Sequence, residues 1–444
     1  MNDMKIIVLD DDPTGIQTVH GIYVYTHWDR QTIREAFLDP NPMFFILTNS
    51  RSFSEEETIK AHREIGSNIQ HVADELEKEF IIVSRGDSTL RGHYPLETEI
   101  LKETLAEREV TVDGEILCPF FIEGGRVTKH GVHYIQEGDG LIPVGETEFA
   151  KDKTFGYQHS NLGAFIEEKT KGRFLAKDCI YIDVELLRQG RSDTVYQRLM
   201  EVNGFNKVIV DSTSYEELQV FVEAFIKAIA SGKRFLIRSA AGLTKILGNI
   251  SDKALLTRKD IRPTNTSYGG IILIGSHVKK TTEQLVCLEQ SGLDLTFIEF
   301  NAETVKVDGG LEAEVDRIVQ QAQDNILHQK TTVVYTSRTL IDLGTKDKEA
   351  ILKASVRISG ALTSIIGRLS IQPSFVLAKG GITSSDVGTK ALKVNKALVL
   401  GQIKPGIPVW KTDADSKFPG MPYIIFPGNV GTRETLKEIV EIII

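Results

Sequence analysis

The sequence predicts an α/β protein with two doubly wound, three-layer α/β/α domains whose sheets are mostly parallel. Three observations lead to this fold. The chain has 444 residues, which is more than one hydrophobic core normally holds. Short apolar runs rich in Ile and Val recur along it, as expected for strands buried on both faces. Longer segments with helical spacing separate these runs, and this alternation favours parallel sheets covered by helices.

The predicted strands form two sets. Those of the first half are Ile6–Leu9, Phe44–Leu47, Phe80–Val83, Ile116–Leu117, Ile180–Ile182, Val208–Val210 and Phe235–Ile237. Those of the second half are Ile271–Ile274, Leu295–Ile298, Val333–Tyr335, Phe375–Leu377, Ala397–Leu400 and Tyr423–Phe426. Two of the helices between them begin at capping boxes, Ser54 with Glu57 and Ser214 with Glu217.

A polar segment separates the two sets. Residues 258–266 contain a proline and show no apolar period, and a new strand begins shortly after them. We therefore predict an N-terminal domain over residues 1–256, a linker over 257–270 and a C-terminal domain over 271–444. The stretch from Glu123 to about Leu162 is predicted to be a long functional loop, because it is irregular and rich in Gly, His and aromatic residues.

Composition narrows the range of partners. A net charge of −9 argues against a nucleic-acid-binding protein, whose surface would be basic. No apolar run approaches the ~20 residues that span a bilayer, so no membrane partner is expected. Cys118, Cys179 and Cys287 show neither metal nor disulfide spacing, and the N-terminus has no signal-peptide pattern. These features favour a cytoplasmic protein, and a homo-oligomer is compatible with them.

The segment Ser84–His93 is the most informative part of the chain. It follows a strand directly and contains Arg85, Asp87, Ser88, Arg91 and Gly92. Ligands of α/β proteins bind at the carboxyl ends of the strands. Arginine binds carboxylates and phosphates with two parallel hydrogen bonds, and glycine lets a ligand approach the backbone closely. The segment predicts a pocket for a small anionic molecule; a surface turn with solvated charges is the alternative.

A second cluster follows the first strand. Asp10, Asp11 and Asp12 repel one another, which favours a function over stability alone. They could hold Mg²⁺, accept hydrogen bonds from a polyol or supply a general base, or they could form a plain acidic turn. A third segment, Gly124–Gly131, could close over a ligand with Lys129 or His130 on an anion, or be a flexible basic loop.

Three strand–glycine–helix segments lie in the second half. They contain Gly275-Ser276-His277, Gly380-Gly381-Ile382-Thr383 and Pro427-Gly428-Asn429. Backbone N–H groups and a helix N-terminus suit phosphate binding at such places. Neither a Walker A motif nor G-x-G-x-x-G is present. An anionic hydroxylated substrate on the N-terminal domain and a nucleotide on the C-terminal one would together indicate phosphoryl transfer.

These motifs resemble the four-carbon acid sugar kinase family over nearly the whole chain. The resemblance is carried by Asp10–Gly15, Asp87–Gly92, Thr147–Asp152, Gly275-Ser276, Gly380-Gly381 and Pro427-Gly428-Asn429. It implies a sugar-acid-binding N-terminal domain, an ATP-binding C-terminal domain and ATP-dependent phosphorylation of a terminal hydroxyl, giving the 4-phosphate of threonate, erythronate or a 3-oxo-tetronate. Ile382 stands where the family usually has an acidic residue.

The reasoning from the residues and the family resemblance give the same hypothesis for the site. Asp87 and Arg91 are the expected catalytic residues, with Asp87 as base because a carboxylate between arginines stays ionised. The expected substrate-binding residues are Asp10, Asp11, Asp12, Arg85, Ser88, Gly92 and Lys129. The expected ATP-binding residues are Ser276, Gly380, Gly381, Ile382, Thr383 and Gly428. Mg²⁺ is expected to accompany ATP, without a dedicated protein metal site.

Two other functions remain open at this point. Asp10-x-Asp12-x-Thr14 and Phe45–Asn49 resemble the motifs of haloacid-dehalogenase-type phosphatases, in which Asp10 would be the nucleophile. That hypothesis leaves the C-terminal half unexplained. A non-catalytic sensor that binds a sugar acid would need the arginine segment but not three phosphate-suited loops.

Overall fold

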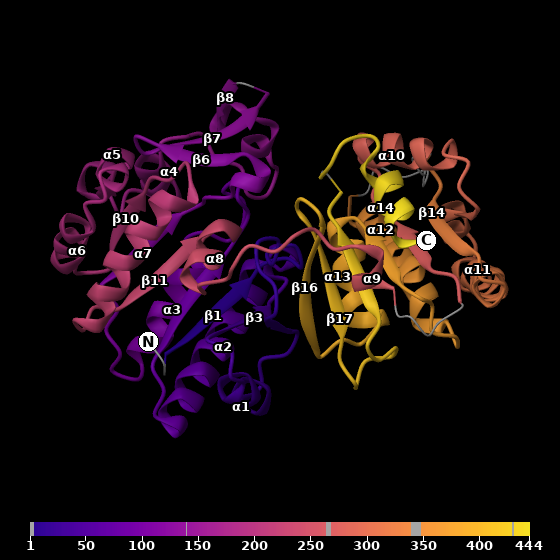
Figure 1. Ribbon diagram of the computed structural model, residues 1–444, viewed down its shortest axis with the longest axis horizontal. Helices are drawn as coiled ribbons and strands as arrows, with labels where there is room; N and C mark the ends of the chain where they lie inside the picture. Colours follow the sequence, from indigo (N-terminus) through magenta and orange to yellow (C-terminus); the bar gives the residue numbers. More distant parts are fainter. Residues whose placement is uncertain (1–3, 139, 263–267, 339–347, 429) are drawn as a thin grey trace. The chain divides into compact units, whose positions relative to one another are not determined.

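A computed structural model describes residues 4–138, 140–262, 268–338, 348–428 and 430–444. Its chain divides into an N-terminal unit, Met1–Asp252, and a C-terminal unit, Lys253–Ile444. Each unit is a mostly parallel sheet with helices on both faces (Figure 1), so the predicted fold class is confirmed. The segment predicted as a linker contains the short helix α9 (Arg258–Ile261), and its residues 263–267 lie outside the described residues.

The sheet of the N-terminal unit is parallel throughout, in the order β2-β3-β1-β4-β11-β5-β10-β9. Its strands are β1 (Lys5–Asp10), β2 (Tyr23–Tyr25), β3 (Met43–Leu47), β4 (Phe80–Arg85), β5 (Gly114–Cys118), β9 (Ile180–Ile182), β10 (Asn206–Val210) and β11 (Phe235–Ser239). The strands predicted for this half are all present. The short edge strand β2 was not predicted, since its three residues are too few to show a pattern.

The helices of this unit are divided between the two faces of the sheet. They are α1 (Arg30–Leu38), α2 (Glu55–Leu76), α3 (Leu96–Ala106), α4 (Leu162–Lys169), α5 (Val184–Arg188), α6 (Ser192–Glu201), α7 (Tyr215–Ala230) and α8 (Ala241–Leu247). Helices α1, α2 and α3 share one apolar core with β1, β3 and β4. The α7 connection runs back across the sheet from β10 to β11, so the right-handed crossover rule puts α7 on the opposite face. Both predicted capping boxes are formed.

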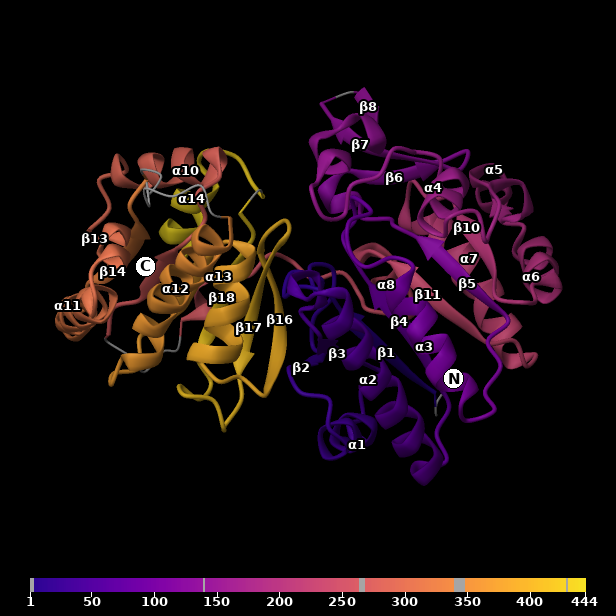
Figure 2. The same ribbon diagram turned by 180° about the vertical axis from the view of Figure 1, so that it is seen from behind.

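A small antiparallel sheet stands in the stretch predicted to be irregular. It consists of β6 (Arg126–Lys129), β7 (Val132–Glu137) and β8 (Gly140–Pro143) in that order. The expectation of a loop without secondary structure is therefore wrong. The strands are too short, and too broken by Gly and polar residues, to give an apolar period. Figure 2 shows β6 of this sheet beside α4, and the backbone N–H of Leu162 at the start of α4 donates to the carbonyl of Gly131 between β6 and β7.

The sheet of the C-terminal unit has the order β13-β14-β12-β15-β18-β17-β16. Its strands are β12 (Ile271–Ile274), β13 (Leu295–Phe300), β14 (Thr331–Thr336), β15 (Val376–Lys379), β16 (Lys396–Lys404), β17 (Ile407–Thr412) and β18 (Pro422–Phe426). Of these described strands, β17 alone was not predicted. It is antiparallel to both of its neighbours, β16 and β18. The other strands, β13, β14, β12, β15 and β18, are parallel to one another.

Helices cover both faces of this sheet as well (Figure 1). They are α10 (Lys279–Glu289), α11 (Gly310–Leu327), α12 (Lys348–Arg368), α13 (Gly381–Asp386) and α14 (Thr435–Ile443). Helices α10 and α14 share an apolar core with β12, β15 and β18. In the described parts of the chain, no helix is both long and apolar enough to cross a membrane.

Candidate active site

The carboxyl ends of β1 and β4 form the centre of the candidate site in the N-terminal unit. The parallel register places Asp10 directly beside Arg85. The segment after β3 reaches the same edge, because Thr48 and Asn49 both donate their backbone N–H to the carbonyl of Asp10. Four segments that are distant in sequence therefore meet at this edge, the fourth being the end of β11 at Arg238 and Ser239.

Arg85 lies inside the acidic cluster. Its Nη1 atom is 3.1 Å from Asp10 Oδ1, 3.3 Å from Asp11 Oδ1 and 3.4 Å from Asp12 Oδ1, and its side chain is 4 % exposed. Burial raises the pKa of Asp10 well above its usual range, although Arg85 acts against it. For Asp12 burial would also raise the pKa, but Arg51 and Arg85 outweigh it and lower the pKa. Arg85 therefore offsets part of the negative charge of the three aspartates.

Arg51 is a residue that the sequence analysis missed. Its Nη2 atom is 2.6 Å from Asp11 Oδ1 and its Nε atom is 2.9 Å from Asp11 Oδ2, a two-pronged contact. It also pairs with Asp12. Burial acts against the charge of Arg51, yet the aspartates raise its pKa well above the usual range. An arginine four residues after a predicted strand was the signal available, but only Phe45–Asn49 was considered there.

Asp87 is surrounded by cationic groups. Arg91 Nε is 2.7 Å from Asp87 Oδ2, and the Thr89 hydroxyl donates to the same oxygen. Burial alone would raise the pKa of Asp87, but the charges of Arg51 and Arg91 outweigh it and hold the pKa well below its usual range. Asp87 is therefore ionised at neutral pH, but besides Arg91 the arginine that acts on it is Arg51 and not the expected Arg85, which pairs with Asp10, Asp11 and Asp12.

Arg91 and Arg126 approach one aromatic ring from two different segments. The Arg91 guanidinium carbon is 4.9 Å from the centroid of Phe149, and that of Arg126 is 6.0 Å from it. Arg91 Nη1 also lies 3.7 Å from Asp152. Burial lowers the pKa of Arg126 while Asp87 acts against this, and its Nε–H is buried without an acceptor among the described residues. Arg91 thus contacts Asp87 directly, and the charges of Arg51 and Arg126 act on it from two other segments.

Lys129 is not brought to this cluster. It lies on β6 with Arg126, but among the described residues it forms no hydrogen bond or ion pair with Asp10, Asp11, Asp12 or Asp87. The neighbouring His130 is anchored elsewhere, since its backbone N–H donates to Asp211 at 2.7 Å. It is therefore Arg126, from the same strand, whose charge acts on Asp87.

Ser88 and Gly92 help to shape the site. Ser88 is 7 % exposed, and its carbonyl lies 2.8 Å from Nε2 of the buried His133. Burial lowers the pKa of His133 to about 4, so this ring is neutral at pH 7. Gly92 has a φ of 122°, and a Cβ there would lie 2.8 Å from Nη2 of Arg238. Glycine is needed at this position for both reasons.

A buried ion pair supports the site from below. Arg238 donates to Glu97 on α3 and lies 2.9 Å from the Ser84 hydroxyl on β4. Burial would raise the pKa of Glu97, but Arg238 outweighs it and the pKa falls to about 2. The glycine before Asp87 makes room for this pair, because a Cβ on Gly86 would lie 2.1 Å from Arg238 Nη2. Arg238 thereby fixes the backbone around Asp87.

The three aspartates are also the candidate metal ligands. Asp10, Asp11 and Asp12 each offer a carboxylate oxygen, and these oxygens lie within 4.8 Å of one another. Oxygen-rich sets of this kind suit Mg²⁺. Their charge is already met by Arg51 and Arg85, so the donor set fits a cation only if these arginines release it.

The C-terminal unit brings most of its predicted residues together. A Cβ on Gly428 would lie 3.0 Å from Ser276 Oγ. Gly380 has a φ of 123°, and a Cβ there would lie 3.1 Å from Ser276 Cβ and 3.3 Å from Thr383 Oγ1. The loops after β12, β15 and β18 therefore meet at one edge, and their glycines leave it open to a ligand. We call these three loops the loop cradle; glycine loops at the ends of parallel strands suit the binding of a phosphate chain.

Gly381 and Ile382 lie on the open side of this cradle. A Cβ on Gly381 would meet nothing within 4 Å, and Ile382 is 67 % exposed. Arg338 was not predicted: its Nη1 donates to the Ser276 carbonyl at 2.7 Å and its Nε to the Thr336 carbonyl at 2.8 Å. Arg338, two residues after the end of β14, thereby holds the loop that follows β12. Asn429 lies outside the described residues.

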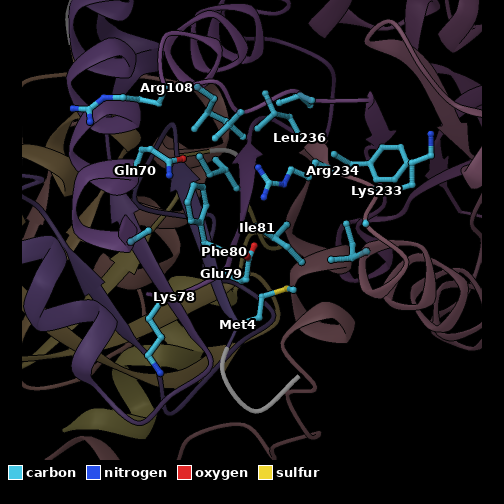
Figure 3. Close-up of a pocket in the computed structure, with 18 of the residues that line it drawn as sticks. Met4, Gln70, Lys78, Glu79, Phe80, Ile81, Arg108, Lys233, Arg234 and Leu236 are labelled. Atoms are coloured by element: carbon cyan, nitrogen blue, oxygen red, sulfur yellow. The ribbon is translucent and has the colours of Figure 1, made fainter. Parts of the chain in front are cut away.

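A cavity of about 790 Å³ lies at the other end of the N-terminal sheet. Figure 3 shows that Phe80, Ile81 and Leu236 line it, with Gln70 and Arg234 at its sides. Phe80 begins β4, whereas Arg85 ends that strand. We do not assign the active site to this cavity, although it is large. Ligands of parallel sheets bind at the carboxyl ends of the strands, and the cluster of arginines and aspartates lies at that end.

Two family models match the chain. One describes a sugar-binding N-terminal domain and matches residues 6–247, and the other describes a nucleotide-binding C-terminal domain and matches residues 271–436. The arginine and aspartate cluster falls in the first, and the three glycine loops fall in the second.

Solved structures share the fold. A protein from Salmonella typhimurium LT2, provisionally named a tRNA synthase, matches with a TM-score of 0.70 and 16% identity, over 98% of each chain. Haemophilus influenzae protein HI1011, assigned to the family DUF1537, matches with a TM-score of 0.64 and 18% identity, over 99% of this chain and 100% of its own. No curated protein matches this chain.

Proposed function

Because the chain belongs to the four-carbon acid sugar kinase family, we propose that it transfers the γ-phosphoryl group of ATP to the terminal hydroxyl of a four-carbon sugar acid. Threonate, erythronate and 3-oxo-tetronates are the candidate substrates, and the product is the 4-phosphate. One observation carries the proposal from the side of the substrate. The charges of three guanidiniums act on an ionised carboxylate at the carboxyl edge of the sugar-binding unit, which is an arrangement suited to a small hydroxylated anion.

We assign the substrate carboxylate to the guanidiniums of Arg91 and Arg126. Arg91 is 23 % exposed, and Arg126 has a buried N–H without an acceptor, so both have donors to offer. The Asp87 carboxylate accepts hydrogen bonds from the substrate hydroxyls, and the Ser88 hydroxyl can donate to them or accept from them. Arg85, with Asp10, Asp11 and Asp12, forms the charged floor beneath them, and Gly92 leaves room for the sugar acid.

The nucleotide is assigned to the C-terminal unit. Ser276, Gly380, Gly381, Ile382, Thr383 and Gly428 would hold its phosphates and sugar. Backbone N–H groups near glycines suit phosphate oxygens, since no side chain blocks their approach. ATP supplies the phosphoryl group when bound, and Mg²⁺ would neutralise its phosphate charge.

The reaction is a direct displacement. The substrate O4 bonds to the γ-phosphorus, the bond from that phosphorus to the β–γ bridging oxygen breaks, and ADP leaves with the electron pair. The hydroxyl proton passes to a carboxylate. Asp87 is ionised and is our candidate for this base.

The phosphatase alternative finds less support. A nucleophilic Asp10 must reach a substrate, yet its side chain is 2 % exposed and ion-paired with Arg85. A sensor without catalytic activity would have no need of a nucleotide-binding domain.

The test is ADP formation from ATP–Mg²⁺ with each of these acids and with the matching neutral polyols. We expect ADP with at least one acid and none with the polyols, because the arginines require a carboxylate. ADP formation with the polyols alone would remove the assignment of Arg91 and Arg126. Phosphate release from a phosphorylated acid without ATP would instead favour the phosphatase.

A further inference from the structure

Lys379 is a buried lysine whose amino group has no anionic partner among the described residues of the C-terminal unit. It is the last residue of β15 and is 0 % exposed. Its Nζ donates to the carbonyl of Pro427 at 3.2 Å and lies 3.5 Å from the centroid of the Phe426 ring. Among the described residues no carboxylate forms an ion pair with Lys379. Its cross-strand neighbours in the register are Ile274 and Phe426, which are apolar.

Such a placement costs free energy, because an ammonium group loses its hydration on burial and is normally paired when fully enclosed. The charged group that acts on Lys379 is another cation, Lys280 in the first turn of α10. The flanking residues of β12 and β18 do not titrate. Nothing in the described part of this unit offsets the burial of the charged form, so an anion supplied from outside would stabilise the protonated lysine.

The position of Lys379 indicates which anion this is. Gly380, the next residue, belongs to the loop cradle, and the Pro427 carbonyl that Lys379 holds directly precedes Gly428. Lys379 therefore contacts the loop after β18 through Pro427, and it directly precedes the loop after β15. A phosphate chain on the cradle would bring several negative charges above this ammonium group.

We propose that Lys379 is a positioning residue for the nucleotide: it holds the Pro427–Gly428 loop through the Pro427 carbonyl and supplies the buried positive charge that the nucleotide phosphates require. This inference rests on the proposed function, because it takes the ligand of the C-terminal unit to be a nucleotide.

A proton linkage follows from this role. Burial, with a smaller contribution from Lys280, lowers the pKa of Lys379 to about 7 in the free protein. Phosphates favour the charged form and raise the pKa again. At pH 8 the free protein has mostly neutral Lys379, so nucleotide binding takes up a proton. Affinity should fall as pH rises above 7, by up to about tenfold per pH unit.

Titration calorimetry of the full chain with ADP–Mg²⁺ at pH 8 tests this. Measurement in two buffers of different ionisation enthalpy gives the number of protons taken up, and ADP permits no turnover. We expect uptake approaching one proton in the natural protein and in the control Lys279→Met, whose side chain is 92 % exposed. Lys379→Arg stays charged at every pH used, so it should bind ADP without proton uptake and with pH-independent affinity.

The outcomes separate this inference from the proposed function. ADP binding without proton uptake in the natural protein overturns the role of Lys379 and leaves the kinase proposal intact. Unchanged uptake in a folded Lys379→Arg variant overturns it too. Failure of the natural protein to bind ADP overturns both proposals. If the variant does not fold, the proton uptake of the natural protein on ADP binding alone decides whether Lys379 has the proposed role.

Discussion

Replacement of Arg91 by glutamine tests the substrate site most sharply. Arg91 is 23 % exposed, pairs with Asp87 at 2.7 Å and lies against Phe149. In our proposal it binds the substrate carboxylate with two parallel hydrogen bonds. Glutamine keeps much of the length of the side chain and removes the charge and the fork of donors.

The expected magnitude differs between activity and stability. One hydrogen bond to a charged group contributes about 1.5–3 kcal/mol, so a two-pronged contact contributes about 3–6 kcal/mol. At 1.4 kcal/mol per tenfold, kcat/KM should fall by about 10²–10⁴. The stability cost is small because Asp87 keeps Arg51 and Thr89 as partners. A partly exposed pair contributes about 1 kcal/mol, which is about 2–4 °C in Tm for a unit of this size.

The assay measures ADP formation over a range of sugar-acid concentrations, together with a thermal melt. Arg34→Gln is the matched control, since Arg34 is 48 % exposed and also forms one ion pair at 2.7 Å, with Glu75. We expect the control to keep full activity. A loss of less than about fivefold in Arg91→Gln would refute the assignment. A large fall in Tm would show that the residue acts on the fold instead.

Three further predictions concern the surroundings of the two sites. Gly86→Ala should destabilise the N-terminal unit by about 3–5 kcal/mol in urea unfolding, because its Cβ, 2.1 Å from Arg238 Nη2, breaks the buried pair with Glu97; normal stability would contradict this packing. Gly428→Val should raise the KM for ATP at least about tenfold with an unchanged KM for the acid, since its Cβ would lie 3.0 Å from Ser276 Oγ; an unchanged KM for ATP would place the nucleotide elsewhere. Burial would raise the pKa of Glu97, but Arg238 outweighs it and lowers the pKa from the ordinary 4.5 to about 2. The ionised carboxylate therefore stabilises the fold by about 3 kcal/mol above pH 4.5. This stabilisation is lost as the pH falls from 5 to 2. Glu97→Gln should flatten this part of the curve of unfolding free energy against pH, and an equally steep curve in the variant would contradict the ion pair.

The buried parallel strands were accessible from the sequence because each is a short apolar run. The strands that were missed lack this pattern for physical reasons. Tyr23–Tyr25 is too short, and Ile407–Thr412 mixes Pro, Trp and Lys in one strand of an antiparallel hairpin. The strands β6, β7 and β8 are short and only partly buried, so they need no continuous apolar run.

The site could be predicted where charged residues directly follow a strand, as Asp10 and Asp87 do. Partners contributed by other strands could not, because pairing of strands is a long-range property. Arg51 reaches the aspartates only because β3 lies beside β1. Both Lys129 and Arg126 lie on β6. Which of them lies near Asp87 depends on how β6 is placed, and the sequence pattern does not predict this.

The identity of the product tests the central claim most directly. The protein is incubated with ATP–Mg²⁺ and the acid that gives ADP, and the product is examined by phosphorus and proton magnetic resonance. We predict one phosphate ester coupled to the protons of carbon 4, formed in the same amount as ADP. ADP accompanied only by inorganic phosphate, or an ester at another carbon, would contradict phosphoryl transfer to the terminal hydroxyl.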